Sequence, residues 1–205
     1  MAYVALSGPT HAEEVALDLP TAIVAASLDR DASMKVQKMF EGTCLRVYAN
    51  RDIRGVEVCG ALKNIIALAT GIAVGAGCGG DNMKAALLTR GMAEIARLET
   101  AMGCSERTVS GLSGIGDIIV TATSMHSRNN RAGLLIGGGM PVSQAVAEVG
   151  MVVEGLHALP AAMELKERYQ VEMPIVEAVH EVVDHGKSPK DVIGRLLKRE
   201  MKDEF

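Results

Sequence analysis

The sequence has 205 residues, the size of one large domain or of one domain with a piece of another. Hydrophobic residues make up 48% and aromatic residues only 2%, so we expect a folded chain whose core consists of aliphatic side chains and methionine. The net charge of −4 and the lack of a basic helix face argue against nucleic acid as a partner.

Four cysteines are widely spaced, and neither they nor the five histidines have the spacing of metal ligands. We therefore expect reduced thiols, no metal site and a cytoplasmic protein. The first residues lack the basic and apolar regions of a secretion signal. The most apolar stretch, residues 65–80, is short and interrupted by glycine, so we expect no membrane span.

The first fifty residues alternate between strand and helix patterns. Strands are predicted at 3–6, 21–26 and 45–48, with a helix beginning near His11 behind a capping Thr10. A second helix is predicted at 29–41. This alternation favours a parallel sheet, and its apolar strands need neighbours on both edges, so we expect the front of the sheet to be absent.

From residue 51 onward the pattern predicts helices only. The fold class is therefore α+β and predominantly helical, with residues 1–50 and 51–205 as two units. Helices are expected at 51–74, 82–102, 128–136, 142–148, 152–169, 175–185 and 189–202.

Lys63 and Asn64 lie side by side inside an apolar segment whose period is helical from Val56 to Ile72. A lysine on a buried helix must be paired, or its pKa must fall, because removing an ammonium from water is costly. The plainer alternative is a lysine whose long stem carries the charge to the rim of the core.

Residues 75–80 match the G-x-G-x-x-G fingerprint of dinucleotide-binding proteins. A true fingerprint follows a strand and opens a helix, whereas a helical segment precedes this one. We interpret it as a crossover between two helices.

Asp117 follows a glycine-rich stretch, and Thr121 shares its face if the segment is helical. A capping aspartate is the plain interpretation, but a carboxylate is the partner that a buried Lys63 requires. Ser127, Arg128 and Asn129 stand at a predicted helix start, where a phosphate can bind, although most such clusters are solvated caps. Glu154 lies in the first turn of a predicted helix. The favourable interaction of a carboxylate with the helix dipole explains this position without any role in a site.

Seven motifs, taken together and in their order along the chain, resemble those of the bacterial NAD(P)-dependent glycerol-3-phosphate dehydrogenases. The resemblance runs from about Tyr3 to the last helix. The motifs are Ser7-Gly8-Pro9-Thr10-His11-Ala12, Gly60-Ala61-Leu62-Lys63-Asn64, Gly79-Gly80-Asp81-Asn82, Thr89-Arg90-Gly91, Gly111-Leu112-Ser113-Gly114-Ile115-Gly116-Asp117, Ser127-Arg128-Asn129 and Val152-Val153-Glu154-Gly155. His11 departs from the expected aromatic residue or serine.

The resemblance implies a Rossmann-type remnant at 1–50, the tail of a truncated dinucleotide-binding domain. It implies an all-α substrate domain at 51–205, similar to the C-terminal domain of 6-phosphogluconate dehydrogenase. It also implies site residues. Lys63 is the acid/base, with Asn64, Asp117 and Thr121 as its polar neighbours; Gly8, Thr10, Lys63, Asp117, Ser127, Arg128 and Asn129 bind the substrate; Ala12, Arg128, Val152 and Glu154 contact the cofactor.

The implied reaction is hydride transfer between NAD or NADP and C2 of glycerol 3-phosphate or dihydroxyacetone phosphate, which feeds phospholipid synthesis. The family begins with a glycine-rich cofactor fingerprint that this chain lacks, so we expect weak or absent cofactor binding and little activity from the chain alone. A homodimer is expected because strand edges are open. The alternatives are a non-catalytic helical binding or dimerisation module, and another dehydrogenase with a helical C-terminal domain.

Overall fold

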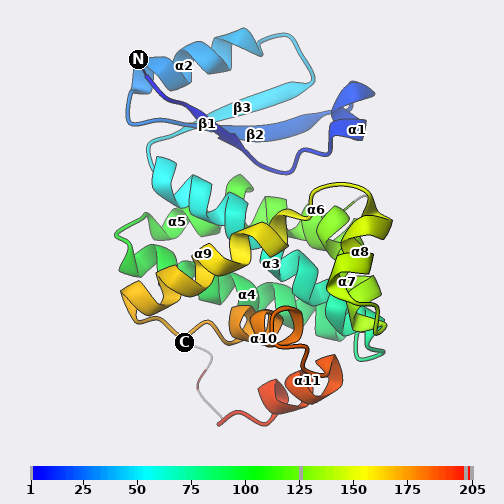
Figure 1. Cartoon of the computed structure of the whole chain (residues 1–205). Coiled ribbons are helices and arrows are strands. Elements are labelled where there is room, and N and C mark those ends of the chain that lie inside the picture. Colours follow the sequence, from blue (N-terminus) through cyan, green and yellow to red (C-terminus); the bar gives the residue numbers. More distant parts are fainter. Residues whose placement is uncertain (1, 125–126, 201–202, 204–205) are drawn as a thin grey trace.

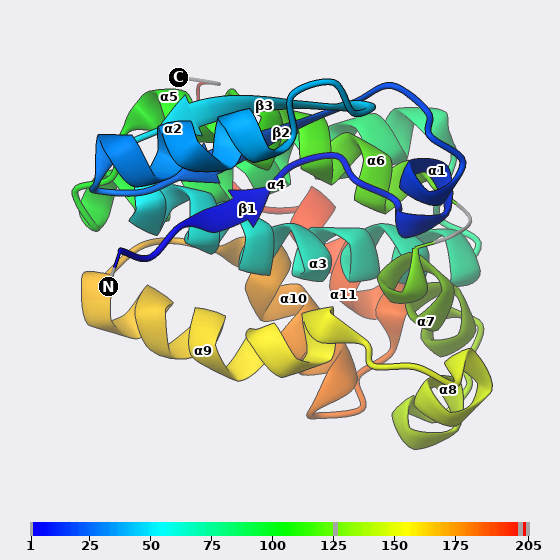
Figure 2. The same cartoon turned by 90° about the horizontal axis from the view of Figure 1, so that it is seen from above.

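The structure is a computed structural model that describes residues 2–124, 127–200 and 203. A three-stranded sheet lies at one end of a helical body, and α11 (Pro189–Leu197) lies at the other end (Figure 1). The long helix α3 (Ile53–Gly75) runs through the body and contacts most of the other helices. Seen from above, the sheet lies over part of α3 (Figure 2).

The sheet has the order β1-β2-β3 and is only partly parallel. Strands β2 (Thr21–Ala26) and β3 (Leu45–Asn50) are parallel, with Thr21 opposite Leu45. Strand β1 (Ala5–Ser7) is antiparallel to β2, so the predicted parallel sheet is wrong at this edge. The reason is the connection: α1 (Ala12–Ala16) has five residues, which is too short for a crossover that returns the chain in the same direction.

The connection between β2 and β3 contains α2 (Arg30–Met39), which begins at a capping aspartate. The carboxylate of Asp29 accepts hydrogen bonds from the backbone N–H groups of Asp31 and Ala32. At α1 the predicted cap is wrong, because His11 occupies the N-cap position and Thr10 donates instead to the carbonyl of Gly8.

Every helix predicted beyond residue 50 is present, and the described residues contain no strand there. The last helix ends at Leu197, and part of its predicted extension lies outside the described residues. Three short helices were not predicted, because segments of four to seven residues are too short to show a helical period. The remaining elements are α4 (Asp81–Ala101), α5 (Glu106–Val109), the π-helix η1 (Leu112–Gly116), α6 (Asp117–Thr123), α7 (Arg128–Gly137), α8 (Val142–Val149), α9 (Glu154–Tyr169) and α10 (Pro174–Val183).

Helix α3 is the centre of the hydrophobic core. Ile65, Ile66 and Leu68 are completely buried in it, and Val56 in its first turn packs against Val24 and Ala26 of β2. Among the described residues α3 is the helix long and apolar enough to cross a membrane, but 67% of that stretch is buried inside the fold, as in the core helix of a globular protein. Residues 75–80 connect α3 to α4, which confirms that they form a crossover between helices.

Helices α3 and α7 touch through glycine. A β-carbon on Gly133 would collide with the carbonyl of Leu68, and one on Gly137 would collide with the carbonyl of Ile72. On α3, a β-carbon at Gly71 would likewise collide with the carbonyl of Asn130. The two backbones can approach this closely only because these positions carry no side chain.

Two glutamates of α4 are fully buried. Glu94 accepts hydrogen bonds from the backbone N–H groups of Ile175 and Val176, at the start of α10, over 2.7 and 3.2 Å. Glu99 accepts a hydrogen bond from the Cys59 thiol over 2.9 Å. Burial raises the pKa of each carboxyl from its ordinary value of 4.5 to about 7.

Gly133→Ala should lower the free energy of unfolding by about 1–3 kcal/mol, because the added methyl group forces α3 and α7 apart. The matched control is Gly194→Ala on α11, where a β-carbon meets no atom within 4 Å. There alanine should raise the stability by roughly 0.5–1 kcal/mol through helix propensity. Urea unfolding followed by circular dichroism measures both, and similar effects at the two positions would contradict the close contact.

The stability of the fold should fall as the pH rises from about 5 to about 7. In this range the native state retains protons on Glu94 and Glu99 that the unfolded state, with pKa values near 4.5, has already released. Each group contributes a slope of at most about 1.4 kcal/mol per pH unit, and the slope ends above the folded pKa. Glu94→Gln should reduce this slope; an unchanged slope in urea titrations at several pH values would show that Glu94 does not titrate in this range.

Candidate functional site

Lys63 and Asp117 form an ion pair between α3 and α6. The distance from Lys63 Nζ to Asp117 Oδ2 is 2.5 Å, and the side chains are only 18% and 5% exposed. The structure therefore confirms that Lys63 lies on a largely buried helix and that Asp117 is its carboxylate partner. Thr121, one turn along α6, donates a hydrogen bond from Oγ1 to Asp117 Oδ1 over 3.2 Å.

The π-helix η1 sets the position of Asp117, because α6 begins directly where η1 ends. Its turn packs tightly against α5: a β-carbon on Gly114 would collide with the carbonyl of Val109. A wide helical turn of this kind is rare and often occurs at functional sites. Here it leads the chain onto α6 so that the carboxylate of Asp117 reaches Lys63.

The environment of Asp117 acts on its pKa in two directions. Burial raises the pKa above its ordinary value of 3.8 and is the largest effect. The positive charge of Lys63, the hydrogen bond from Thr121 and the nearby His11 ring all oppose this rise. Sequence reasoning did not connect His11 to this pair, because a residue 106 positions away in the numbering gives no local signal.

A second set of polar side chains lies beside the first. Asn64 donates to Glu154 Oε2 over 3.1 Å, and its own amide oxygen accepts from Asn129 Nδ2 over 2.9 Å. Asn129 Oδ1 in turn accepts from the backbone N–H of Gly155 over 2.8 Å. This network joins α3, α7 and the start of α9, and Asn64 and Asn129 are buried in it.

Arg128 lies at the edge of this network with its guanidinium accessible. Its Nη2 atom is 4.0 Å from Glu154 Oε1, and the side chains are 40% and 57% exposed. Ser127 caps α7, since its Oγ accepts a hydrogen bond from the backbone N–H of Asn130 over 3.2 Å. The start of α7 thus presents a cation next to a helix N-terminus, an arrangement that suits an anion.

Four of the expected site residues are not joined to this cluster of polar side chains. Gly8 is buried in the loop after β1, and a β-carbon there would lie 3.1 Å from the Cα of Ile23. Thr10, Ala12 and Val152 are exposed, and within the described residues they form no hydrogen bond or ion pair with the cluster. This loop nevertheless passes close to η1, because a β-carbon on Gly116 would touch the Pro9 ring at 3.7 Å.

Asn129→Ala should lower the free energy of unfolding by about 1–3 kcal/mol, because it leaves the Gly155 N–H and the Asn64 amide oxygen buried without their partner. Arg131→Ala, at an exposed position of the same helix, is the control and should change stability by less than about 0.5 kcal/mol. Chemical denaturation of both variants measures the difference. A loss no larger in Asn129→Ala than in the control would rule out a stabilising network.

Comparison with known proteins gives the same family along the whole chain. The family model described as the NAD-dependent glycerol-3-phosphate dehydrogenase C-terminus matches residues 52–194, and the corresponding N-terminus model matches residues 1–33. A glycerol-3-phosphate dehydrogenase [NAD(P)+] 2 of Lactobacillus delbrueckii subsp. bulgaricus is 58% identical over 99% of this chain and 60% of its own length. One of Clostridium tetani is 55% identical over 98% of this chain and 57% of its own length.

Solved structures agree with the sequence matches. The crystal structure of glycerol-3-phosphate dehydrogenase from Coxiella burnetii superposes with a TM-score of 0.93 at 39% identity, over 97% of this chain and 61% of that one. The chain thus spans about 60% of the length of the relatives it matches. With the buried lysine–aspartate pair and the asparagine network in place, the matches show that this chain belongs to the NAD-dependent glycerol-3-phosphate dehydrogenase family.

Proposed function

We propose that residues 51–205 are the substrate domain of an sn-glycerol-3-phosphate dehydrogenase and that residues 1–50 are the tail of its dinucleotide-binding domain. The observation that carries this proposal is the buried Lys63–Asp117 pair together with an accessible Arg128, whose partner Glu154 accepts a hydrogen bond from Asn64, the neighbour of Lys63. An ammonium held by a carboxylate is suited to proton transfer, and a guanidinium at a helix N-terminus is suited to a phosphate.

In this proposal Lys63 donates a proton to the C2 oxygen of dihydroxyacetone phosphate and takes it back in the reverse reaction. Asp117 holds the ammonium in place, and Thr121 fixes the carboxylate by its hydrogen bond. Asn64 is held from two sides, by Asn129 and Glu154, so it can orient the substrate without moving. The substrate phosphate binds Arg128, Ser127 and Asn129 at the start of α7.

The residues assigned to the cofactor fit a contact with only part of it. Glu154 and Arg128 offer exposed polar groups, and Val152 offers an exposed apolar one. When bound, NAD or NADP supplies or accepts the hydride at C2. The G-x-G-x-x-G match of this sequence joins two helices, so the chain has no fingerprint to hold the pyrophosphate at that point. We therefore propose that residues 1–205 alone catalyse little or no turnover.

The lack of a fingerprint at residues 75–80 also favours the second candidate function. This candidate is a non-catalytic helical module that binds the phosphorylated substrate or a second copy of the chain. We further propose a homodimer in the cytoplasm. Exposed apolar side chains on the first fifty residues, including Leu6, Leu28 and Tyr48, support self-association. Sedimentation velocity at two protein concentrations tests it, and a constant monomer mass would contradict it.

Glycerol 3-phosphate should bind this chain, and Arg128→Ala should weaken the binding at least tenfold, because it removes the charged partner of the phosphate. Arg131→Ala on the same helix is the matched control and should bind as the unchanged chain does. Isothermal titration calorimetry measures all three. Equal affinities for the two variants would refute the assigned phosphate site.

The catalytic assignment is tested separately by following NADH oxidation with dihydroxyacetone phosphate. Measurable turnover would exclude the non-catalytic candidate, and Lys63→Ala should then abolish it. Turnover that survives Lys63→Ala would show that another group moves the proton.

A further inference from the structure

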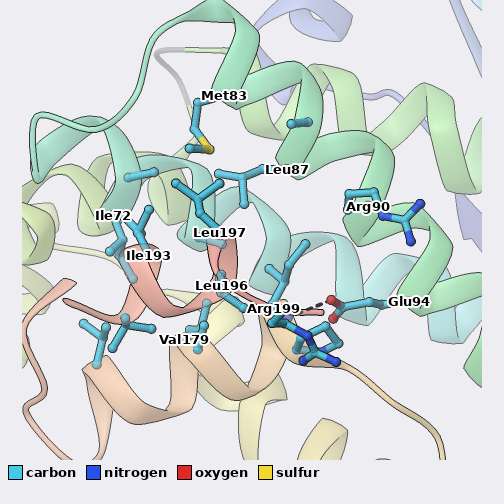
Figure 3. Close-up of a pocket in the computed structure, with 18 of the residues that line it drawn as sticks. Ile72, Met83, Leu87, Arg90, Glu94, Val179, Ile193, Leu196, Leu197 and Arg199 are labelled. Carbon is cyan, nitrogen blue, oxygen red and sulfur yellow. Dashed lines mark hydrogen bonds between the residues drawn. The ribbon is translucent and has the colours of Figure 1, made fainter. Parts of the chain in front are cut away.

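A cavity of about 720 Å³ lies at the end of the helical body away from the sheet. Its walls come from α3, α4, α10 and α11, and Figure 3 shows the side chains that line it. Most are aliphatic, among them Ile72 of α3, Leu87 of α4 and Val179 of α10. A volume of this size falls within the range of roughly 300–1,000 Å³ that is typical of small-molecule sites.

The cavity is separate from the Lys63 site although the same helix serves both. Ile72 follows Lys63 by nine residues, which places it about 14 Å further along α3 and on the opposite side of the helix. None of the residues assigned above to substrate or cofactor lines the cavity. The Thr89-Arg90-Gly91 motif, for which the proposed function gives no role, contributes Arg90 to its wall.

One face of α4 changes from apolar to charged along the cavity. Met83, Leu87, Arg90 and Glu94 recur every three or four residues, and Figure 3 shows them along one wall. Both carboxylate oxygens of Glu94 already accept N–H groups of α10. Within the described part of the chain, Arg90 has no hydrogen bond or ion pair and is exposed.

The other charges at this end are mostly engaged or solvated. Arg97 donates two hydrogen bonds to the carbonyl of Glu172, and the carboxylate of Glu172 is 3.4 Å from Arg199. Glu200 and Asp203 are exposed and lie beyond the end of α11, whereas Arg90 lies within helix α4. Arg90 is therefore the positive charge on the helical wall that is available to an anion.

The concave shape favours a small molecule over a second copy of the chain as the occupant. A cavity of this volume between four helices suits one small molecule, whereas a stable subunit interface buries a broad surface. An apolar interior with a few polar groups that fix orientation is the usual form of a small-molecule site.

We propose that this cavity binds a single-chain amphiphile with an anionic head group. The alkyl chain lies along Ile72, Leu87 and Val179, and the head group meets Arg90 at the mouth. This site is additional to the proposed dehydrogenase site and does not depend on it.

Isothermal titration of the unchanged chain with dodecyl phosphate and with dodecanoate, below their micelle concentrations, tests the proposal. At least one of them should bind at least tenfold more tightly than dodecyltrimethylammonium, and inorganic phosphate should not compete. The two anionic probes distinguish a phosphate from a carboxylate head group. Equal binding of the cationic probe, or no binding of either anion, would overturn the proposal.

Two pairs of variants locate the site. Arg90→Ala should weaken binding about tenfold, whereas Arg107→Ala on α5 should not. Ala86→Phe places a ring in the cavity and should weaken binding at least tenfold, whereas Ala85→Phe, equally exposed but outside the cavity, should not.

Circular dichroism confirms that each variant is folded, and sedimentation velocity reports its mass. If Ala86→Phe lowers the mass while Ala85→Phe does not, and no amphiphile binds, the cavity is a contact between subunits and the proposal is wrong.

Discussion

The ion pair between Lys63 and Asp117 is the interaction on which the rest of the structure depends. An ammonium in the middle of the most buried helix is strongly unfavourable without a partner, because it loses its hydration in the core. The carboxylate must therefore reach it from another element, and the π-helix η1 and the start of α6 supply it. Removing either charge would leave the other in a site that is closed to most solvent.

The same helix also organises the second half of the site through its packing. Glycines at the contact between α3 and α7 let the two backbones touch. This brings the start of α7 close to Asn64, so that Asn129 can bond both to Asn64 and to the first turn of α9. The close helix contact, which looks purely structural, thus positions the residues assigned to substrate binding.

Two further buried carboxyl groups lie away from the site. Glu94 ties the start of α10 to α4, and Glu99 bonds the Cys59 thiol of α3. Each carboxyl group loses its bound water on folding and accepts one or two hydrogen bonds from protein donors instead. Burial raises the pKa of each to about 7. The helical body therefore contains polar links between its helices as well as aliphatic packing, and these links respond to pH in the neutral range.

The sequence by itself determined the helical body, the family, and the need for a partner to Lys63. These follow from local period, from ordered motifs, and from the energetic cost of burying one charge. The prediction from sequence failed at β1, which pairs antiparallel because α1 is too short for a crossover. It also missed α5, η1 and α6, because these segments are too short to show a helical period. Only the tertiary structure decided that His11 lies near Asp117, that Asn64 is held between Asn129 and Glu154, and that a cavity exists behind α3. Each of these joins residues far apart in the chain, and such contacts are fixed by packing rather than by any local pattern.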